Sequence, residues 1–283
     1  MSYDAAAVRA FFDGFAEREW SRLDATPQGR TNYAIHLRAL TRHIQPGMRV
    51  LDMGSGPGRF AIDIARAGCE VALADISPVQ LGLARRRLED EGLLERATGF
   101  HQLDVTDLHG LDTAAYDIVV CFGGVISYTR ERYAAGLREL ARVVRPGGLV
   151  LVSVMSLHGT LRLAGPLDAV GFLARLDEHI DRSAILAGEN IVFTRPGSAE
   201  LHQPLALFTA EGLRRAMADA QLVVEQMASS NPLIAQFQRV PQIADSAEAT
   251  AVLRELELAA CEVPGLLDTG SHLIAVARRS VST

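Results

Sequence analysis

Short apolar segments alternate with amphipathic helical patterns along most of this chain, and this alternation most restricts the fold. Five apolar segments fall between residues 48 and 154, and a patterned helix follows most of them. Strands that are apolar on both faces are typical of a parallel sheet covered by helices on both sides. The sequence therefore predicts an α/β fold with a doubly wound sheet.

The expected strands continue beyond the central region, and two irregular stretches interrupt them. We expect strands at 48–53, 69–74, 98–103, 116–122, 149–154, 222–227 and 272–277. No linker rich in Pro, Gly or Ser divides the chain, which favours one domain over residues 1–283. We expect a helical N-terminal cap (1–45), a core (48–156, completed by 209–279) and two lid inserts (157–205 and 228–268). The inserts are expected to hold helices near 169–180 and 247–260.

Composition excludes several functional classes. The chain has 283 residues and no lysine, which excludes Schiff-base catalysis and a phosphate-loop lysine. Its net charge of −6 argues against binding to a nucleic-acid backbone. No segment approaches the apolar length of a membrane span, and no signal peptide is evident, so we expect a cytoplasmic protein. The three cysteines are far apart and predict neither disulfides nor a metal site.

Three features at the ends of successive expected strands point to a nucleotide-like ligand. The first is a glycine-rich turn, Asp52-Met53-Gly54-Ser55-Gly56-Pro57-Gly58, which allows a ligand to approach the backbone closely. The second is Asp75, followed by Ile76, and a carboxylate there can accept hydrogen bonds from a ribose diol. The third is Asp104, followed by Val105, which suits an adenine amino group and ring. Ligands of open α/β sheets bind at this edge.

These segments resemble a known family. The runs VLDMGSGPGRF (50–60), ALAD (72–75), QLD (102–104) and RVVRPGGLVLVSV (142–154) are similar to motifs of the class I S-adenosylmethionine (SAM)-dependent methyltransferases. The resemblance covers residues 48–156 and resumes at 209–279. It implies a Rossmann-like, seven-stranded sheet whose last strand is antiparallel. It also implies SAM as cofactor, with S-adenosylhomocysteine (SAH) as product. Asp52, Gly54, Ser55, Gly56, Asp75, Ile76, Asp104, Val105, Phe122 and Gly123 would bind it.

Residues outside these motifs are further candidates for the site. Tyr128 and His158 follow the fourth and fifth expected strands, so they are candidate catalytic bases, and His202 is a third. Tyr33 and Arg30 lie on an N-terminal helix that could close over SAM, where Arg30 could pair with the methionine carboxylate. Each of these side chains also has an ordinary packing, capping or surface role open to it.

The expected function is methyl transfer to an O or N atom, with C not excluded, of a small organic molecule. The lid is rich in apolar residues with a few polar ones, which favours a small organic substrate. An NAD(P)-dependent oxidoreductase is an alternative, although the spacing here is G-x-G-x-G and no lysine is present. A non-catalytic SAM-binding protein is another. By family resemblance, nucleic-acid methyltransferases that act on a base amino group carry an Asn/Asp-Pro-Pro-aromatic motif after the fourth strand. That place here reads Cys121-Phe122-Gly123-Gly124, which disfavours such an enzyme. The oligomeric state cannot be deduced from these patterns.

Overall fold

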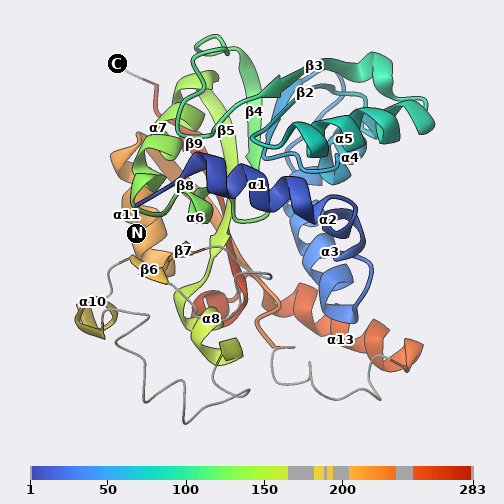
Figure 1. Ribbon diagram of the computed structural model, residues 1–283. Coiled ribbons are helices and arrows are strands. Elements are labelled where there is room, and N and C mark those ends of the chain that lie inside the picture. Colours follow the sequence, from blue (N-terminus) through green and yellow to red (C-terminus); the bar gives the residue numbers. More distant parts are fainter. Residues whose placement is uncertain (1, 165–181, 188–189, 194–203, 234–244, 282–283) are drawn as a thin grey trace.

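A seven-stranded sheet forms the centre of the computed structural model, which describes residues 2–164, 182–187, 190–193, 204–233 and 245–281 (Figure 1). Its strand order is β3-β2-β1-β4-β5-β9-β8. The strands are β1 (Arg49–Met53), β2 (Glu70–Asp75), β3 (Ala97–Gln102), β4 (Tyr116–Cys121), β5 (Val144–Met155), β8 (Leu222–Ser230) and β9 (His272–Arg279). A separate antiparallel pair joins β6 (Ile191–Phe193) to β7 (Leu205–Leu207).

The strand directions confirm the predicted sheet. Neighbouring strands from β3 through β5 pair in parallel, and β9 pairs antiparallel with both β5 and β8. The last strand therefore runs opposite to the other six. Strand order reverses beside β1, because the chain first builds outwards to β3 and then returns to β4 on the other side. Ligands of such sheets bind at this switch point, beyond the carboxyl ends of the strands.

Helices cover both faces of the sheet, as the continuously apolar strands predict. Val50 faces a core with Ile35, Leu40 and Ile64, whereas the adjacent Leu51 faces the opposite core. The first face is covered by α3 (Pro27–Thr41), α4 (Arg59–Arg66) and α5 (Pro78–Asp90), and the second by α7 (Tyr133–Val143) and α11 (Ala210–Asp219). The remaining helices are α1 (Ala5–Phe15), α2 (Arg18–Ser21), α6 (Val125–Tyr128), α8 (Leu157–Ala164), α10 (Arg182–Ala187) and α13 (Ala247–Ala260), with short 3₁₀ turns at 94–96, 130–132 and 264–269.

Several element boundaries differ from the sequence prediction. Within the expected helical cap, α3 begins at Pro27, because the Thr26 hydroxyl accepts from Gly29 N and the proline occupies the first turn. Strand β5 begins at Val144, ahead of the strand expected at 149–154, and so includes the Pro146-Gly147-Gly148 segment. The expected helix near 169–180 and His202 lie outside the described residues. In the described part of the chain, every helix is too short or too polar to cross a membrane.

Helix α1 is the element that most affects access to the ligand edge. It starts after Asp4, whose side chain accepts from two backbone N–H groups, and it crosses over the strands to pack against α5 (dark blue in Figure 1). Short α2 follows and leads into α3. The N-terminal helices therefore lie over the edge of the sheet where the glycine-rich turn and the strand-end aspartates meet.

Candidate cofactor and active site

The turn after β1 has a backbone that only glycine adopts easily. Gly54, Gly56 and Gly58 have φ angles of +72°, +51° and +87°. The N–H groups of Gly54 and Ser55 both donate to Ala74 O, at 2.7 and 3.1 Å, which folds the turn onto the end of β2. A Cβ atom built on Gly54 would lie 2.1 Å from Val125 Cγ2, so a side chain at this position would collide with α6. The absence of a side chain at Gly54 therefore lets the turn pack closely against α6.

Asp75 ends β2 directly beside this turn. Its Oδ2 accepts from Gly56 N and its Oδ1 from Ser77 N, both at 2.8 Å, so the carboxylate is fixed by the backbone. Burial raises the pKa of Asp75 to about 6, although these two hydrogen bonds oppose the rise. A carboxylate oxygen can accept more than one hydrogen bond, and Asp75 therefore still suits a pair of ribose hydroxyl groups.

Asp104 lies on the far side of the same space, just after β3. Its Oδ1 accepts from Thr106 N at 2.8 Å, and its Oδ2 accepts from the Tyr3 hydroxyl at 2.6 Å. Burial and this hydrogen bond to Asp104 raise the pKa of Tyr3, which keeps the phenol protonated. Asp104, which the sequence predicts to accept from an adenine amino group, therefore already accepts from Tyr3 through Oδ2 in this structure.

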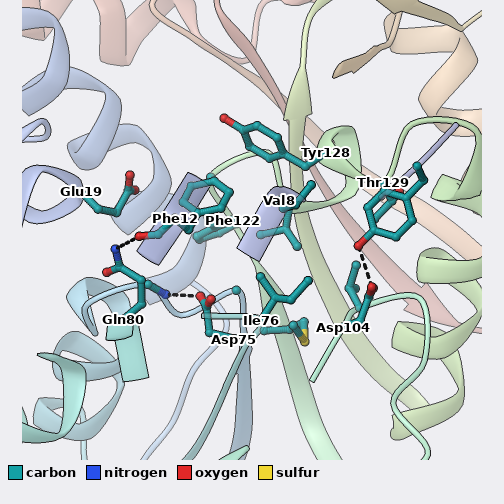
Figure 2. A pocket seen from close by; sticks show the side chains of 17 residues that line it. Val8, Phe12, Glu19, Asp75, Ile76, Gln80, Asp104, Phe122, Tyr128 and Thr129 are labelled. Carbon is teal, nitrogen blue, oxygen red and sulfur yellow. Dashed lines mark hydrogen bonds between the residues drawn. The ribbon is translucent and has the colours of Figure 1, made fainter. Parts of the chain in front are cut away.

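These side chains line one pocket with an internal space of about 600 Å³. Figure 2 shows Asp75 and Asp104 on opposite sides of it, with Ile76 between them. Nine residues of the sequence prediction line the pocket: Gly54, Gly56, Asp75, Ile76, Asp104, Val105, Phe122, Gly123 and Tyr128. The length and composition of this lining, with an acid at each end and apolar side chains between, suit an adenosine joined to an amino acid.

The N-terminal segment supplies pocket residues that the sequence prediction did not name. Val8 and Phe12 of α1, Glu19 of α2 and Tyr3 line the pocket, as does Gln80 of α5. The Gln80 amide donates to Phe12 O and to Ala16 O, which ties α5 to α1 (Figure 2). Val8 and Phe12 are spaced as on one apolar face of a helix, but this spacing does not indicate which part of the fold that face contacts. Glu19 carried no comparable signal.

Asp52 and Ser55 were also predicted to bind the cofactor, but both side chains are buried and neither lines the pocket. Asp52 is 2% exposed, and burial raises its pKa to about 7, with the nearby charge of Asp75 adding to the rise. Asp52 Oδ2 and Ser55 Oγ are enclosed, and neither has a hydrogen-bond partner among the described residues. A bound ligand that contacts the turn could use such orphaned polar atoms.

The other candidates outside the motifs are spread over the ligand edge. Tyr128 packs edge-to-face on Phe12, with ring centroids 5.1 Å apart, and lines the pocket. The Tyr33 hydroxyl donates to Asp63 Oδ2 at 2.6 Å, outside the pocket. Arg30 donates to Asp24 O at 2.8 Å and lines a separate hollow beside α13. His158 is exposed on α8. The roles suggested for these four residues stay predictions.

A second, smaller cavity adjoins the first at Gly123 and has room for about one water molecule. It lies between the N-terminal helices, the start of α4 and the start of β9, and its lining residues are Arg22, Leu23, Asn32, Tyr33, His36, Phe60, Gly123 and His272. The sequence prediction missed His36 and His272, because their proximity joins segments 236 residues apart. Among the described residues, no cluster of three or more His, Cys, Asp or Glu side chains could hold a metal ion.

The fold and the pocket define an α/β protein built to bind an adenosine-containing ligand at the β1–β2–β3 edge. Residues 50–148 match a family described as a methyltransferase domain. The domain that contains this segment belongs to the class I SAM-dependent methyltransferases, a family whose methyl donor is SAM.

Individual relatives show how widely this family varies. The chain is 35% identical over 120 residues to a demethylmenaquinone methyltransferase of Clavibacter sepedonicus, covering 42% of this chain and 46% of that protein. It is 29% identical over 166 residues to a tRNA 5-carboxymethoxyuridine methyltransferase of Escherichia coli, covering 56% and 62%. It therefore spans only about half to three fifths of these relatives. The crystal structure of the Burkholderia thailandensis 1,6-didemethyltoxoflavin-N1-methyltransferase, with SAH bound, superposes with a TM-score of 0.56 at 19% identity, over 98% of this chain and 89% of that one.

Proposed function

We propose that this chain transfers the methyl group of SAM to an O or N atom, or else a C atom, of a small organic molecule. The single observation that carries the proposal is the pair of adjoining cavities that share Gly123. One has acids and a glycine-rich turn suited to SAM, and the other is lined by aromatic rings. The division into a cap over 1–45, a core and two lid inserts stays part of this proposal.

Each residue of the first cavity has a task that its environment supports. Asp75, fixed by two backbone N–H groups, would hold the ribose hydroxyls, and Asp104 would accept from the adenine amino group. The open turn at Gly54 and Gly56 would receive the methionine moiety. When SAM is bound there, its sulfonium supplies the methyl group. The chain's main contribution would be to hold the acceptor atom in line with that methyl group and to exclude water.

The enclosed site also bears on the alternatives. A tRNA base must be extruded from its strand to reach such a pocket, and the chain's net charge of −6 does not favour a nucleic-acid backbone. One of the relatives is a demethylmenaquinone methyltransferase, which is consistent with an organic acceptor that is not a nucleic acid. A protein that binds SAM without using it would have the same first cavity, so only turnover separates these two functions.

Calorimetric titration with SAM and SAH tests the cofactor assignment. We expect micromolar binding by the wild-type protein and loss of binding by Gly56→Arg and by Asp75→Ala. Gly92→Ala is a matched control, because Gly92 also has a positive φ (+68°) but has open space around it. Absence of SAM and SAH binding by the folded wild-type protein would contradict the proposal. SAM binding without SAH production, across a panel of small hydroxyl and amine compounds, would favour the non-catalytic alternative.

A further inference from the structure

The cofactor pocket is too small for SAM while the N-terminal segment lies over it. The pocket spans about 600 Å³ when the space open to solvent is included, but its walls enclose only about 70 Å³. Cavities that hold ligands of this size typically measure ~300–1,000 Å³. One wall is formed by Tyr3 together with Val8 and Phe12 of α1 (Figure 2). This wall must therefore move before the cofactor can occupy the pocket.

Tyr3 uses the acceptor that an adenine amino group would need. Its hydroxyl group donates to Asp104 Oδ2 at 2.6 Å, while Asp104 Oδ1 already accepts from Thr106 N at 2.8 Å. Burial and the bond to Asp104 raise the pKa of Tyr3, so the phenol remains a neutral donor. An adenine amino group is also a neutral donor that carries its hydrogen atom on a flat ring. The two groups are therefore chemically alike as partners of this carboxylate.

The residues beside Tyr3 hold the N-terminal end of the segment in place. Tyr3 N donates to Glu131 Oε1 at 2.6 Å, and Arg130 Nη1 donates to Ser2 O at 2.8 Å. Both partners follow α6, on the opposite side of the pocket from α5. Together with the bond to Asp104, these contacts fasten the segment across the ligand edge of the sheet.

The other end of α1 has the properties of a hinge. Ala16, directly after α1, has φ +44° and ψ −123°, a backbone conformation that residues with a side chain rarely adopt. Gln80 Nε2 donates to Phe12 O and Ala16 O, and Ser77 Oγ donates to Asp13 Oδ1 at 2.5 Å. The strain at Ala16 is thus maintained by contacts with α5, and rotation about Ala16 would relieve it.

A surface hollow of about 300 Å³ lies on the other side of the first turns of α1. Ala5, Ala6 and Arg9 of α1 line this hollow, which shares Ile76 and Asp104 with the cofactor pocket. Tyr3 and the start of α1 therefore separate the two spaces. Lifting this end of α1 would join them at Asp104 and would open a route for the cofactor.

We propose that residues 2–16 form an autoinhibitory lid, in which the Tyr3 hydroxyl group takes the place of the adenine amino group at Asp104. The lid pivots at Ala16, and its closed position and the bound cofactor exclude one another. The apparent dissociation constant for the cofactor is then the intrinsic constant divided by the fraction of protein with an open lid. This inference rests on the proposed function, because it takes the pocket as the cofactor site.

A covalent bridge between α1 and α5 tests whether the lid must move. In the variant Asp13→Cys, Ser77→Cys, a short thiol-reactive cross-linker would join two side chains that are in contact in the wild-type protein. Since α1 is one continuous helix from Ala5 to Phe15, a bridge at residue 13 also holds Tyr3 at Asp104. We expect the bridged protein to bind SAH at least about tenfold more weakly than the untreated variant. Wild-type protein treated with the cross-linker is the control, because its three cysteines are buried.

A second experiment follows Tyr3 itself. The chain has five tyrosines, so protein labelled with 3-fluorotyrosine gives few ¹⁹F resonances, and Tyr3→Phe assigns the one from Tyr3. We expect saturation with SAH to expose the Tyr3 resonance to solvent, as measured by its shift between H₂O and D₂O. Tyr3→Phe should also associate with SAH about 2- to 10-fold faster, because the closed lid has lost a hydrogen bond. The matched control is Tyr116→Phe, at the start of β4 and away from the ligand edge.

Each contrary result has its own meaning. Equal SAH affinity of the bridged and untreated variant would overturn the requirement for lid opening. A Tyr3 resonance that stays shielded in SAH-saturated protein would show that the lid covers the cofactor, and it would overturn the mutual exclusion. If the untreated variant binds no SAH, the wild-type ¹⁹F measurement decides. Failure of the wild-type protein to bind SAH would instead contradict the proposed function itself.

Discussion

Substitution of Gly54 by alanine tests whether the turn after β1 is shaped by contact with α6 as well as by its own backbone. Any non-glycine residue in the left-handed region costs about 1–2 kcal/mol. At Gly54 the new Cβ would also lie 2.1 Å from Val125 Cγ2, against ~3.5–4.0 Å for a normal carbon contact, so Val125 must move by roughly 1.5 Å. Overpacking of this kind costs about 1–3 kcal/mol. The expected total loss of stability is about 2–5 kcal/mol.

Gly92→Ala isolates the backbone contribution, because φ there is +68° against +72° at Gly54 and a Cβ added to Gly92 would have no neighbouring atom within 4 Å. Urea unfolding, followed by circular dichroism, gives both free energies of unfolding. We expect Gly92→Ala to lose about 1–2 kcal/mol and Gly54→Ala to lose about 1–3 kcal/mol more. Equal losses would refute the claim that contact with Val125 of α6 restricts position 54 to glycine.

Three further variants test the surroundings of the pocket. Burial raises the pKa of Asp52 from its usual 3.8 to about 7, so the folded state loses stability progressively as the pH rises between these two values, and the loss is complete above about pH 7. Asp52→Asn should therefore unfold at higher urea than the wild type at pH 8, with the gain fading towards pH 4. A gain confined to low pH would contradict this. Tyr3→Phe removes the protein donor of Asp104 Oδ2, which leaves this oxygen free to accept from the ligand. SAH should therefore bind about 2- to 10-fold more tightly in a fluorescence titration. Weaker binding would show that Tyr3 itself assists ligand binding. Ser77→Ala removes the N-cap of α5 and the hydrogen bond from Ser77 to Asp13 of α1. It should lower the free energy of unfolding by about 1 kcal/mol and speed limited proteolysis within α1. Unchanged proteolysis would argue against anchoring of α1 by Ser77.

The sheet and its ligand edge were predictable because their signals are local. The apolar strands, the Gly54–Gly58 turn and the acids at 75 and 104 each occupy a few consecutive residues, and the ends of parallel strands must meet at one edge. The prediction of seven strands with the last one antiparallel is confirmed. That part came from the family resemblance, since periodicity does not reveal strand direction.

The remainder of the site depends on contacts between distant segments. Tyr3 contacts Asp104, 101 residues later in the sequence, and His36 contacts His272, 236 residues later. On a helix, His36 falls among ordinary apolar positions, so its pattern indicates burial without indicating a cavity. Asp52 shows the reverse case, because a residue inside a recognisable motif is buried in β1 and does not line the pocket.

The position of α1 has a consequence for how the protein folds. Its partners are assembled much later in the chain: Tyr3 N donates to Glu131, and Arg130 donates to Ser2 O. Contacts of such long sequence separation form late, because the cost of closing the intervening loop must be met before they contribute. Helix α1 is thus expected to dock after the sheet is complete. Its amide hydrogens should exchange with solvent sooner than those of β1 or β4, since late-docking elements are commonly among the first to open.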